Sequence, residues 1–217
     1  MQRMGFIRKV YGILSVQLLV TFGIVLVFSL VDSVKRHVQN NPGMLYAAIG
    51  VTLATIIALT CCRGVARKVP GNYICLFVFT LAEAYLLGTI ASYYTTTSVA
   101  WALGATVLLT LALTAFAWQT RIDFTTMSGS LFVILIAFIM FGIWSAIFRS
   151  QVLQTLYAAL GVIVFGIFLV YDTQLIVGGK HRAVSLTSDE YIFAALNLYI
   201  DIVQLFLYIL RLFGSRD

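Results

Sequence analysis

The sequence predicts an all-α integral membrane protein that crosses the bilayer seven times. Hydrophobic residues make up 61% of the 217-residue chain, charged residues only 10%, and the mean hydropathy is +1.01. A soluble domain carries about 25% charged residues, so this composition indicates a membrane protein. Seven apolar runs have the length of about 20 residues that a helix needs to cross the hydrocarbon core. We therefore expect a single seven-helix transmembrane domain over residues 1–217.

Short polar or charged segments separate the seven predicted spans. The spans cover residues 10–31, 44–62, 73–93, 98–118, 129–148, 152–177 and 191–213. Pro-Gly pairs mark the turns before the second and third spans, at Pro42-Gly43 and Pro70-Gly71. The first run is long and lacks a small-residue cleavage site, which favours a span over a removable signal peptide.

The start of the last helix has its own signal. Gly178 and Gly179 stop the sixth span, and Thr187 is followed three residues later by Glu190. A hydroxyl and a carboxylate at this spacing form a capping box, in which each side chain satisfies a free backbone N–H at a helix start. This pattern predicts that the last helix begins at about Ser188.

The basic residues predict the orientation in the membrane. With alternating spans, nine Lys and Arg lie on the N-terminal side and five on the other. The positive-inside rule then predicts a cytosolic N-terminus and a C-terminus on the far side. If the last segment were re-entrant, the count would be eleven against three, and charge counting alone prefers that alternative.

Two kinds of site are disfavoured by the sequence. The three cysteines and two histidines have no spacing that suits zinc, and we expect no bound cofactor. The net charge of +6 comes from residues scattered through the loops, which indicates lipid headgroups rather than nucleic acid as the partner.

Three carboxylates fall inside predicted spans, at Glu83, Asp172 and Asp201. A charged Asp at the centre of a membrane helix costs about 2.5 to 3.5 kcal/mol, so acids at these positions are candidate functional residues. The alternative is that each is neutral or hydrogen-bonded and only ties helices together. Glu83 is a candidate for an ion path.

Asp172 and Asp201 lie on consecutive predicted helices, which favours an aspartate pair. Asn197 precedes Asp201 by four residues and shares its helix face, so we include Asn197 in the candidate ion path. Measured from Gly178 and Ser188, the two acids lie about 9 Å and about 20 Å deep, a mismatch of roughly two turns. An arginine could bridge this difference, and Arg63 and Arg67 at the end of the second span are the candidates.

Two close carboxyl groups titrate as a unit, because both cannot ionise cheaply. The pair would therefore respond to pH. When charged, it offers the hard oxygen ligands that calcium uses, so we expect weak calcium binding at Asp172 and Asp201.

Several segments resemble the Bax-inhibitor-like family of transmembrane proteins, in particular its lifeguard and Golgi anti-apoptotic branch. They are FIRKVYGILSVQLLVT near the start, ARKVPGNY, QTRIDFT, LYAALGVIVFGIFLVYDTQLIVGG and SDEYIFAALNLYIDIVQLFLYILRLFG. The resemblance implies a central last helix and a pH-sensing pair, Asp172 and Asp201, that gates a calcium leak in Golgi or endoplasmic reticulum membranes. It also implies an arginine partner from the second helix: Arg67 matches the lifeguard pattern, and Arg63 is the spatial alternative. An anti-apoptotic role, and partners among apoptosis-regulating or calcium-release membrane proteins, are implied in the same way.

Three other functions are alternatives to the leak channel. An aspartyl protease of the membrane would carry Gly-x-Gly-Asp where this chain has Leu-Tyr-Ile-Asp at 198–201, so we expect no enzymatic activity. A proton-coupled carrier finds little support, because no inverted repeat is detectable. A non-conducting regulator that binds partner membrane proteins stays open as the alternative.

Overall fold

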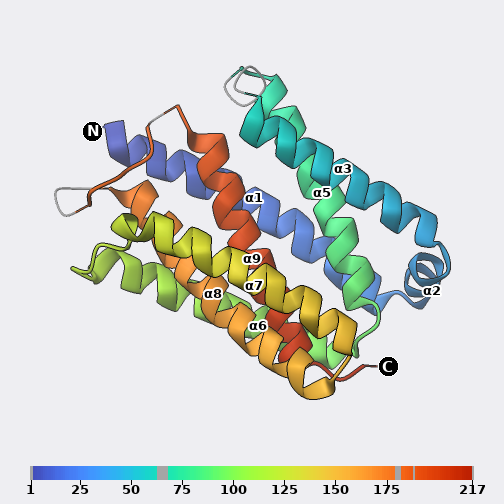
Figure 1. Ribbon diagram of the computed structural model, residues 1–217. Coiled ribbons are helices and arrows are strands. Elements are labelled where there is room, and N and C mark those ends of the chain that lie inside the picture. The colour runs from blue at the N-terminus through green and yellow to red at the C-terminus, as the bar shows by residue number, and fades with distance from the viewer. Residues whose placement is uncertain (1, 63–67, 179–181, 188, 217) are drawn as a thin grey trace. The chain divides into compact units, whose positions relative to one another are not determined.

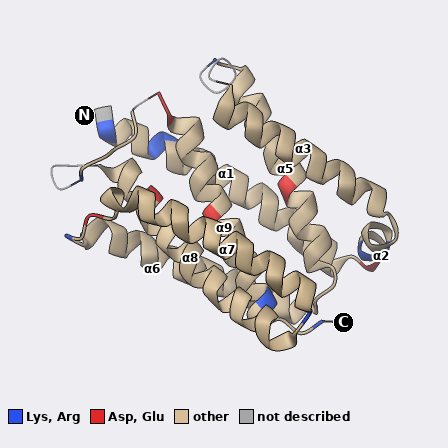
Figure 2. Cartoon of the chain, viewed as in Figure 1, with Lys and Arg blue, Asp and Glu red and all other residues tan. Residues whose placement is uncertain are grey.

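The computed structural model describes residues 2–62, 68–178, 182–187 and 189–216. Seven of its helices are long and apolar enough to cross a membrane (Figure 1). These helices are α1 (Gln2–Leu30), α3 (Pro42–Cys61), α5 (Gly71–Ala91), α6 (Thr96–Gln119), α7 (Ser128–Phe148), α8 (Gln151–Val177) and α9 (Tyr191–Phe213). The all-α, seven-span prediction is therefore confirmed. Long stretches of these helices carry no charge, as Figure 2 shows.

One short helix was not expected from the hydropathy pattern. Helix α2 (Asp32–Asn40) has nine residues, too few to cross a bilayer, and follows α1 after the extended residue Val31. Asp32 in its first turn and His37 in its last turn are placed as the helix dipole favours. Gln39 Nε2 donates to the carbonyl of Ser92 at 2.8 Å, which fastens α2 to the end of α5.

The chain divides into two compact units. The first unit comprises residues 1–101, 187–199 and 215–217, and the second comprises residues 102–186 and 200–214. Helices α6 and α9 each contribute residues to both units.

The first unit has α5 packed between α1 and α3. Its interior is tied together by polar contacts as well as apolar packing. Tyr199 of α9 is fully buried, shares a 2.7 Å hydrogen bond with Thr21 of α1, and packs edge-on against Phe79 of α5. Gly88 of α5 lies so close to Phe28 that an added Cβ would come within 2.7 Å of its ring.

In the first unit, the two ends of the last segment contact residues at the two ends of α5. Asn72 at the start of α5 donates to the hydroxyl of Tyr191 at the start of α9, and Thr95, after the end of α5, donates to the carbonyl of Ser215. The last segment is thus one continuous crossing helix rather than a re-entrant one. The charge count preferred the re-entrant alternative because Arg211 and Arg216 would then join the basic residues on the N-terminal side.

The second unit holds α7, α8 and the short 3-10 helix η1 (Phe124–Met127) in mutual contact, together with parts of α6 and α9. An aromatic cluster joins three of its helices: Phe138 of α7, Tyr157 and Phe165 of α8, and Tyr208 of α9. The hydroxyls of Tyr157 and Tyr208 are 3.1 Å apart.

Helix α9 is the most buried of the seven. In its most apolar 18-residue window 67% is buried, against at most 44% in the others. This agrees with the central last helix that the family resemblance implied.

The predicted start of α9 was three residues early. The helix begins at Tyr191, and the carbonyl of Glu190 accepts its first hydrogen bond from Ala194. Thr187 N and Glu190 Oε2 are 2.9 Å apart, as a capping box requires, but they close a turn that precedes the helix. Ser188 lies outside the described residues.

Candidate functional site: a buried aspartate pair

Two carboxyl groups meet inside the second unit. Asp172 of α8 is 7% exposed and Asp201 of α9 is 4% exposed. Their side chains are hydrogen-bond partners. The structure thus brings together the two acids that the sequence singled out as a pair.

Helix register explains why they meet directly. Asp172 lies six residues before Gly178, the C-cap residue of α8, and Asp201 lies ten residues after Tyr191, the first residue of α9. The difference in depth is about 6 Å, one turn, instead of the two turns calculated from a start at Ser188. The later start of α9 therefore removes much of the mismatch, and the two carboxyl groups make contact without a bridging residue.

A hydrogen bond between two carboxyl groups requires a proton, because an ionised carboxylate can only accept. Oδ2 of Asp201 is buried, and no backbone or side-chain N–H or O–H group among the described residues donates to it. A buried acceptor without a donor is costly unless another group reaches it. The pair therefore depends on the shared proton.

The same oxygens limit what the pair could hold. Calcium takes six to eight oxygen ligands, and two carboxylates supply at most four. Within the part of the chain that the structure describes, no group of three or more His, Cys, Asp or Glu residues is placed to bind a metal ion. The pair alone is suited to brief, weak cation contact rather than to a tight site.

The end of α8 just beyond the pair is held by two connecting segments, residues 120–127 and 182–187, which together we call the end clamp. Gln174, two residues after Asp172 and fully buried, accepts from the N–H of Phe124 at 2.8 Å and donates to the carbonyl of Ile122 at 3.0 Å. Arg182 donates to the carbonyls of Thr120 and Ile122 at 2.9 and 2.6 Å. Arg182 also donates to the carbonyl of Ala117 at 3.2 Å, which satisfies a free carbonyl in the last turn of α6.

Asp123 joins the two segments of the end clamp. Its carboxylate accepts from Thr125 Oγ1 at 2.6 Å, from the N–H of Thr125 at 3.0 Å and from the N–H of Ala183 at 2.8 Å. These hydrogen bonds, that from the Thr125 side chain foremost, lower the pKa of Asp123 below its usual value. The sequence signal that could have indicated this turn is an Asp two residues before a Thr, since Asp side chains commonly accept from the backbone two residues on.

The other predicted site residues lie elsewhere. Glu83 is half-buried on α5 in the first unit, near Tyr199, and Asn197 is half-buried on α9 in the same unit. Asn197 and Asp201 share a face of α9, as their spacing predicted. Arg63 and Arg67, the predicted gating partners, lie outside the described residues.

The fold and this site define a class: a seven-helix integral membrane protein with a carboxyl pair buried between its last two helices. A family model described as inhibitor of apoptosis-promoting Bax1 matches residues 3–217. Protein lifeguard 3 of mouse is 41% identical over 99% of this chain and 70% of its own length, and its human counterpart is 40% identical over the same shares. The Golgi anti-apoptotic protein of vaccinia virus (strain Lister) is 34% identical over 97% of this chain and 85% of its own. The chain belongs to the Bax-inhibitor family, which confirms the resemblance found in the sequence.

Proposed function

We propose that this protein is a pH-sensitive leak channel for calcium in an intracellular membrane, with Asp172 and Asp201 as its gate. The observation that carries the proposal is the contact between two buried carboxyl groups on neighbouring helices. Intramembrane acids that face each other in this way are typical of ion and proton pathways.

In the closed state the two carboxyl groups share one proton, and their hydrogen bond holds α8 against α9. Loss of that proton leaves two negative charges side by side in a medium of low dielectric, so they repel each other. Repulsion separates the helices at this level and exposes carboxylate oxygens to an arriving cation. Weak binding by few ligands then permits release, which conduction requires.

The remaining candidate residues take supporting roles in this proposal. Arg63 or Arg67 supplies the positive partner of the ionised pair, as the family resemblance implies. Glu83 and Asn197 provide polar oxygen atoms along the ion path. No step of this mechanism makes or breaks a covalent bond, so the role we propose is not enzymatic.

The relatives support the cellular setting of the proposal. The name of the vaccinia relative places that protein in the Golgi and in the control of apoptosis. We propose the Golgi or the endoplasmic reticulum for this chain, and a restraint on apoptosis through the calcium content of that compartment. Apoptosis-regulating or calcium-release membrane proteins are its proposed partners.

The proposal is tested by calcium flux into liposomes that contain only the purified protein. We expect wild-type flux to rise from about pH 6 to about pH 8, and we expect Asp172→Asn and Asp201→Asn to remove this pH dependence because neither retains a pair that can repel. Asp32→Asn, an acid of the short helix α2, is the matched control and keeps the wild-type profile. Absence of flux in every folded variant and in the wild type would instead favour the non-conducting regulator.

A further inference from the structure

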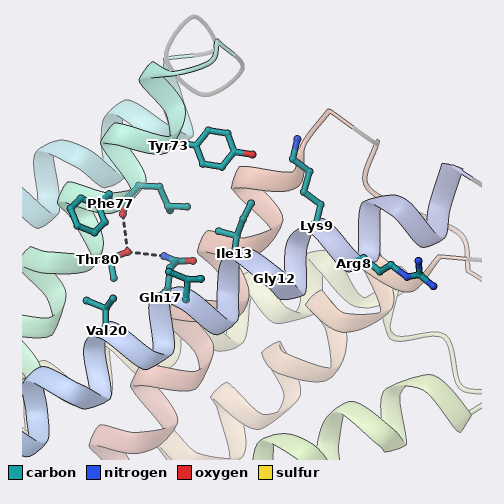
Figure 3. A pocket seen from close by; sticks show the side chains of 11 residues that line it. Arg8, Lys9, Gly12, Ile13, Gln17, Val20, Tyr73, Phe77 and Thr80 are labelled. Carbon is teal, nitrogen blue, oxygen red and sulfur yellow. Dashed lines mark hydrogen bonds between the residues drawn. The ribbon is translucent and has the colours of Figure 1, made fainter.

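A groove of about 420 Å³ lies between α1 and α5 in the first unit, and neither aspartate of the pair lines it (Figure 3). Its walls are mostly apolar, with Ile13, Val16 and Val20 from α1 and Leu76 and Phe77 from α5. Gln17 and Thr80 are joined by a 2.9 Å hydrogen bond, and this buried pair lies toward the inner end. A volume of this size is typical of small-molecule sites.

Basic residues mark one end of the groove, which we call its mouth. Lys9 Nζ lies 3.3 Å from the ring centroid of Tyr191 and 6.0 Å from that of Tyr73. Two aromatic rings fix the position of the ammonium group, because a cation is attracted to the face of an aromatic ring. Arg8, the adjacent residue, is exposed and also lines the groove.

The groove is long and narrow enough to hold an extended acyl chain. Twelve residues of α1 separate Arg8 from Val20, which corresponds to about 18 Å along the helix. Gly12 lies between these ends, and an added Cβ at this position would meet no atom within 4 Å. The absence of a side chain at Gly12 therefore widens the groove and does not serve close packing against another helix.

We propose that this groove binds an anionic glycerophospholipid, with its phosphate group at Lys9 and Arg8 and one acyl chain along α1 and α5. A soluble anion would make no contact with the apolar walls of the groove. An uncharged lipid would offer no counter-charge to Arg8 and Lys9. An anionic lipid matches both parts of the site. In the orientation that the loop charges predict, the mouth faces the cytosolic leaflet, where anionic lipids are concentrated.

The headgroup, not the acyl chain, should decide which lipid the groove selects. Bulk lipid chains are as apolar as the groove, so moving a chain from bilayer to groove gains little hydrophobic free energy. Discrimination therefore comes from the headgroup charge. Each Lys or Arg side chain near an anionic lipid surface strengthens the attraction enough to raise the affinity for the anionic lipid about fivefold.

The test uses the full-length protein in nanodiscs of phosphatidylcholine. The probe is a trace of phosphatidylserine with a photoreactive acyl chain. The comparison probe is phosphatidylcholine with the same photoreactive acyl chain. We expect the serine lipid to label peptides of residues 12–20 and 76–80 several times more strongly than the choline lipid. Arg8→Gln and Lys9→Gln should each lower labelling by the serine lipid about fivefold and leave labelling by the choline lipid unchanged.

Filling the groove provides the second arm of the test. Gly12→Leu should abolish labelling of these peptides by both probes, because its side chain enters the groove. Gly50→Leu, at an exposed position of α3 with equally open space, is the matched control and should keep wild-type labelling. Equal labelling by the two probes, or labelling that survives Gly12→Leu, would overturn the proposal. Calcium flux plays no part in this readout, so the result is independent of the proposed channel function.

Discussion

Glycine at position 161 lets the ring of Tyr208 lie against the backbone of α8. An ideal Cβ at Gly161 would come within 2.5 Å of that ring, a distance that real Cβ atoms do not show. Tyr208 is also stacked on Phe165 and paired through its hydroxyl with Tyr157. A single missing side chain therefore sets how closely α8 and α9 approach in the second unit.

We predict that Gly161→Ala destabilises the protein by about 1 to 3 kcal/mol, because the methyl group forces the Tyr208 ring from a packed position. Unfolding in mixed micelles measures the change. Gly104→Ala on α6 is the control: its Cβ meets open space, and the exchange of Gly for Ala in a helix should stabilise by a few tenths to about 1 kcal/mol. Equal stability of the two variants would refute the close approach.

At the residue scale, the sequence identified the aspartate pair but not its surroundings. Asp172 and Asp201 stand out because a carboxylate is rare in an apolar run. Tyr199 and Tyr208 do not stand out, because tyrosine near a membrane commonly marks an interface, and Gln174 does not because it lies near the end of its span. Their hydrogen bonds join residues that are 50 or more positions apart, and such pairings depend on packing that no local pattern encodes.

At the scale of elements, the end clamp is the feature most relevant to the pair. Gln174 lies half a turn after Asp172 and holds the segment between α6 and η1, while Arg182 and Asp123 hold the segment that follows α8. The clamp fixes the end of α8 close to the pair. Motion of α8 at the level of Asp172 is therefore coupled to these hydrogen bonds.

The pKa of Asp123 gives the clamp a defined pH dependence. Because the folded-state pKa is lowered, the hydrogen bonds stabilise the clamp above the unfolded pKa of about 4 and are lost as the pH falls through the folded pKa. We predict that exchange of the Ala183 amide hydrogen accelerates over this acidic range beyond its intrinsic rate. In the Asp123→Asn variant, the Ala183 amide hydrogen should exchange fast already at neutral pH. A wild-type exchange rate in this variant would show that the Asp123 carboxylate does not hold the two segments together.

The elements themselves were predictable to different degrees. Hydropathy gave the seven spans because a helix in lipid must satisfy its own backbone and be apolar along its length. It missed α2, whose polar nine residues are held by one side-chain contact to Ser92. The capping-box pattern, not hydropathy, placed the start of α9 too early, because the Thr187 to Glu190 contact also forms in a turn outside a helix.

At the scale of the whole molecule, α9 contributes residues to both compact units, as α6 does, and Asp201 lies at the middle of α9. The contacts of Tyr191 and Ser215 with opposite ends of α5 show that α9 is a complete crossing. An odd number of crossings places the two termini on opposite sides of the membrane.

We predict a cytosolic N-terminus and a C-terminus on the other side. In a background without native cysteines, a thiol at Met4→Cys should react with a membrane-impermeant reagent added from the cytosolic side, and a thiol at Gly214→Cys should react only after permeabilisation. Reaction of both thiols in sealed vesicles would contradict the crossing of α9. Reaction of Gly214→Cys alone would leave the crossing intact and reverse the orientation that the loop charges predict.

The central claim is that Asp172 and Asp201 share one proton whose loss opens the pathway. Infrared spectroscopy of protein with isotope-labelled aspartate measures this directly, through the carbonyl band that only a protonated carboxyl group shows. We predict one such band in the closed wild type, its disappearance in parallel with the onset of calcium flux as the pH rises, and its absence from the double variant Asp172→Asn/Asp201→Asn. A band unaffected by the double variant, or flux that changes with pH while the band does not, would contradict the account.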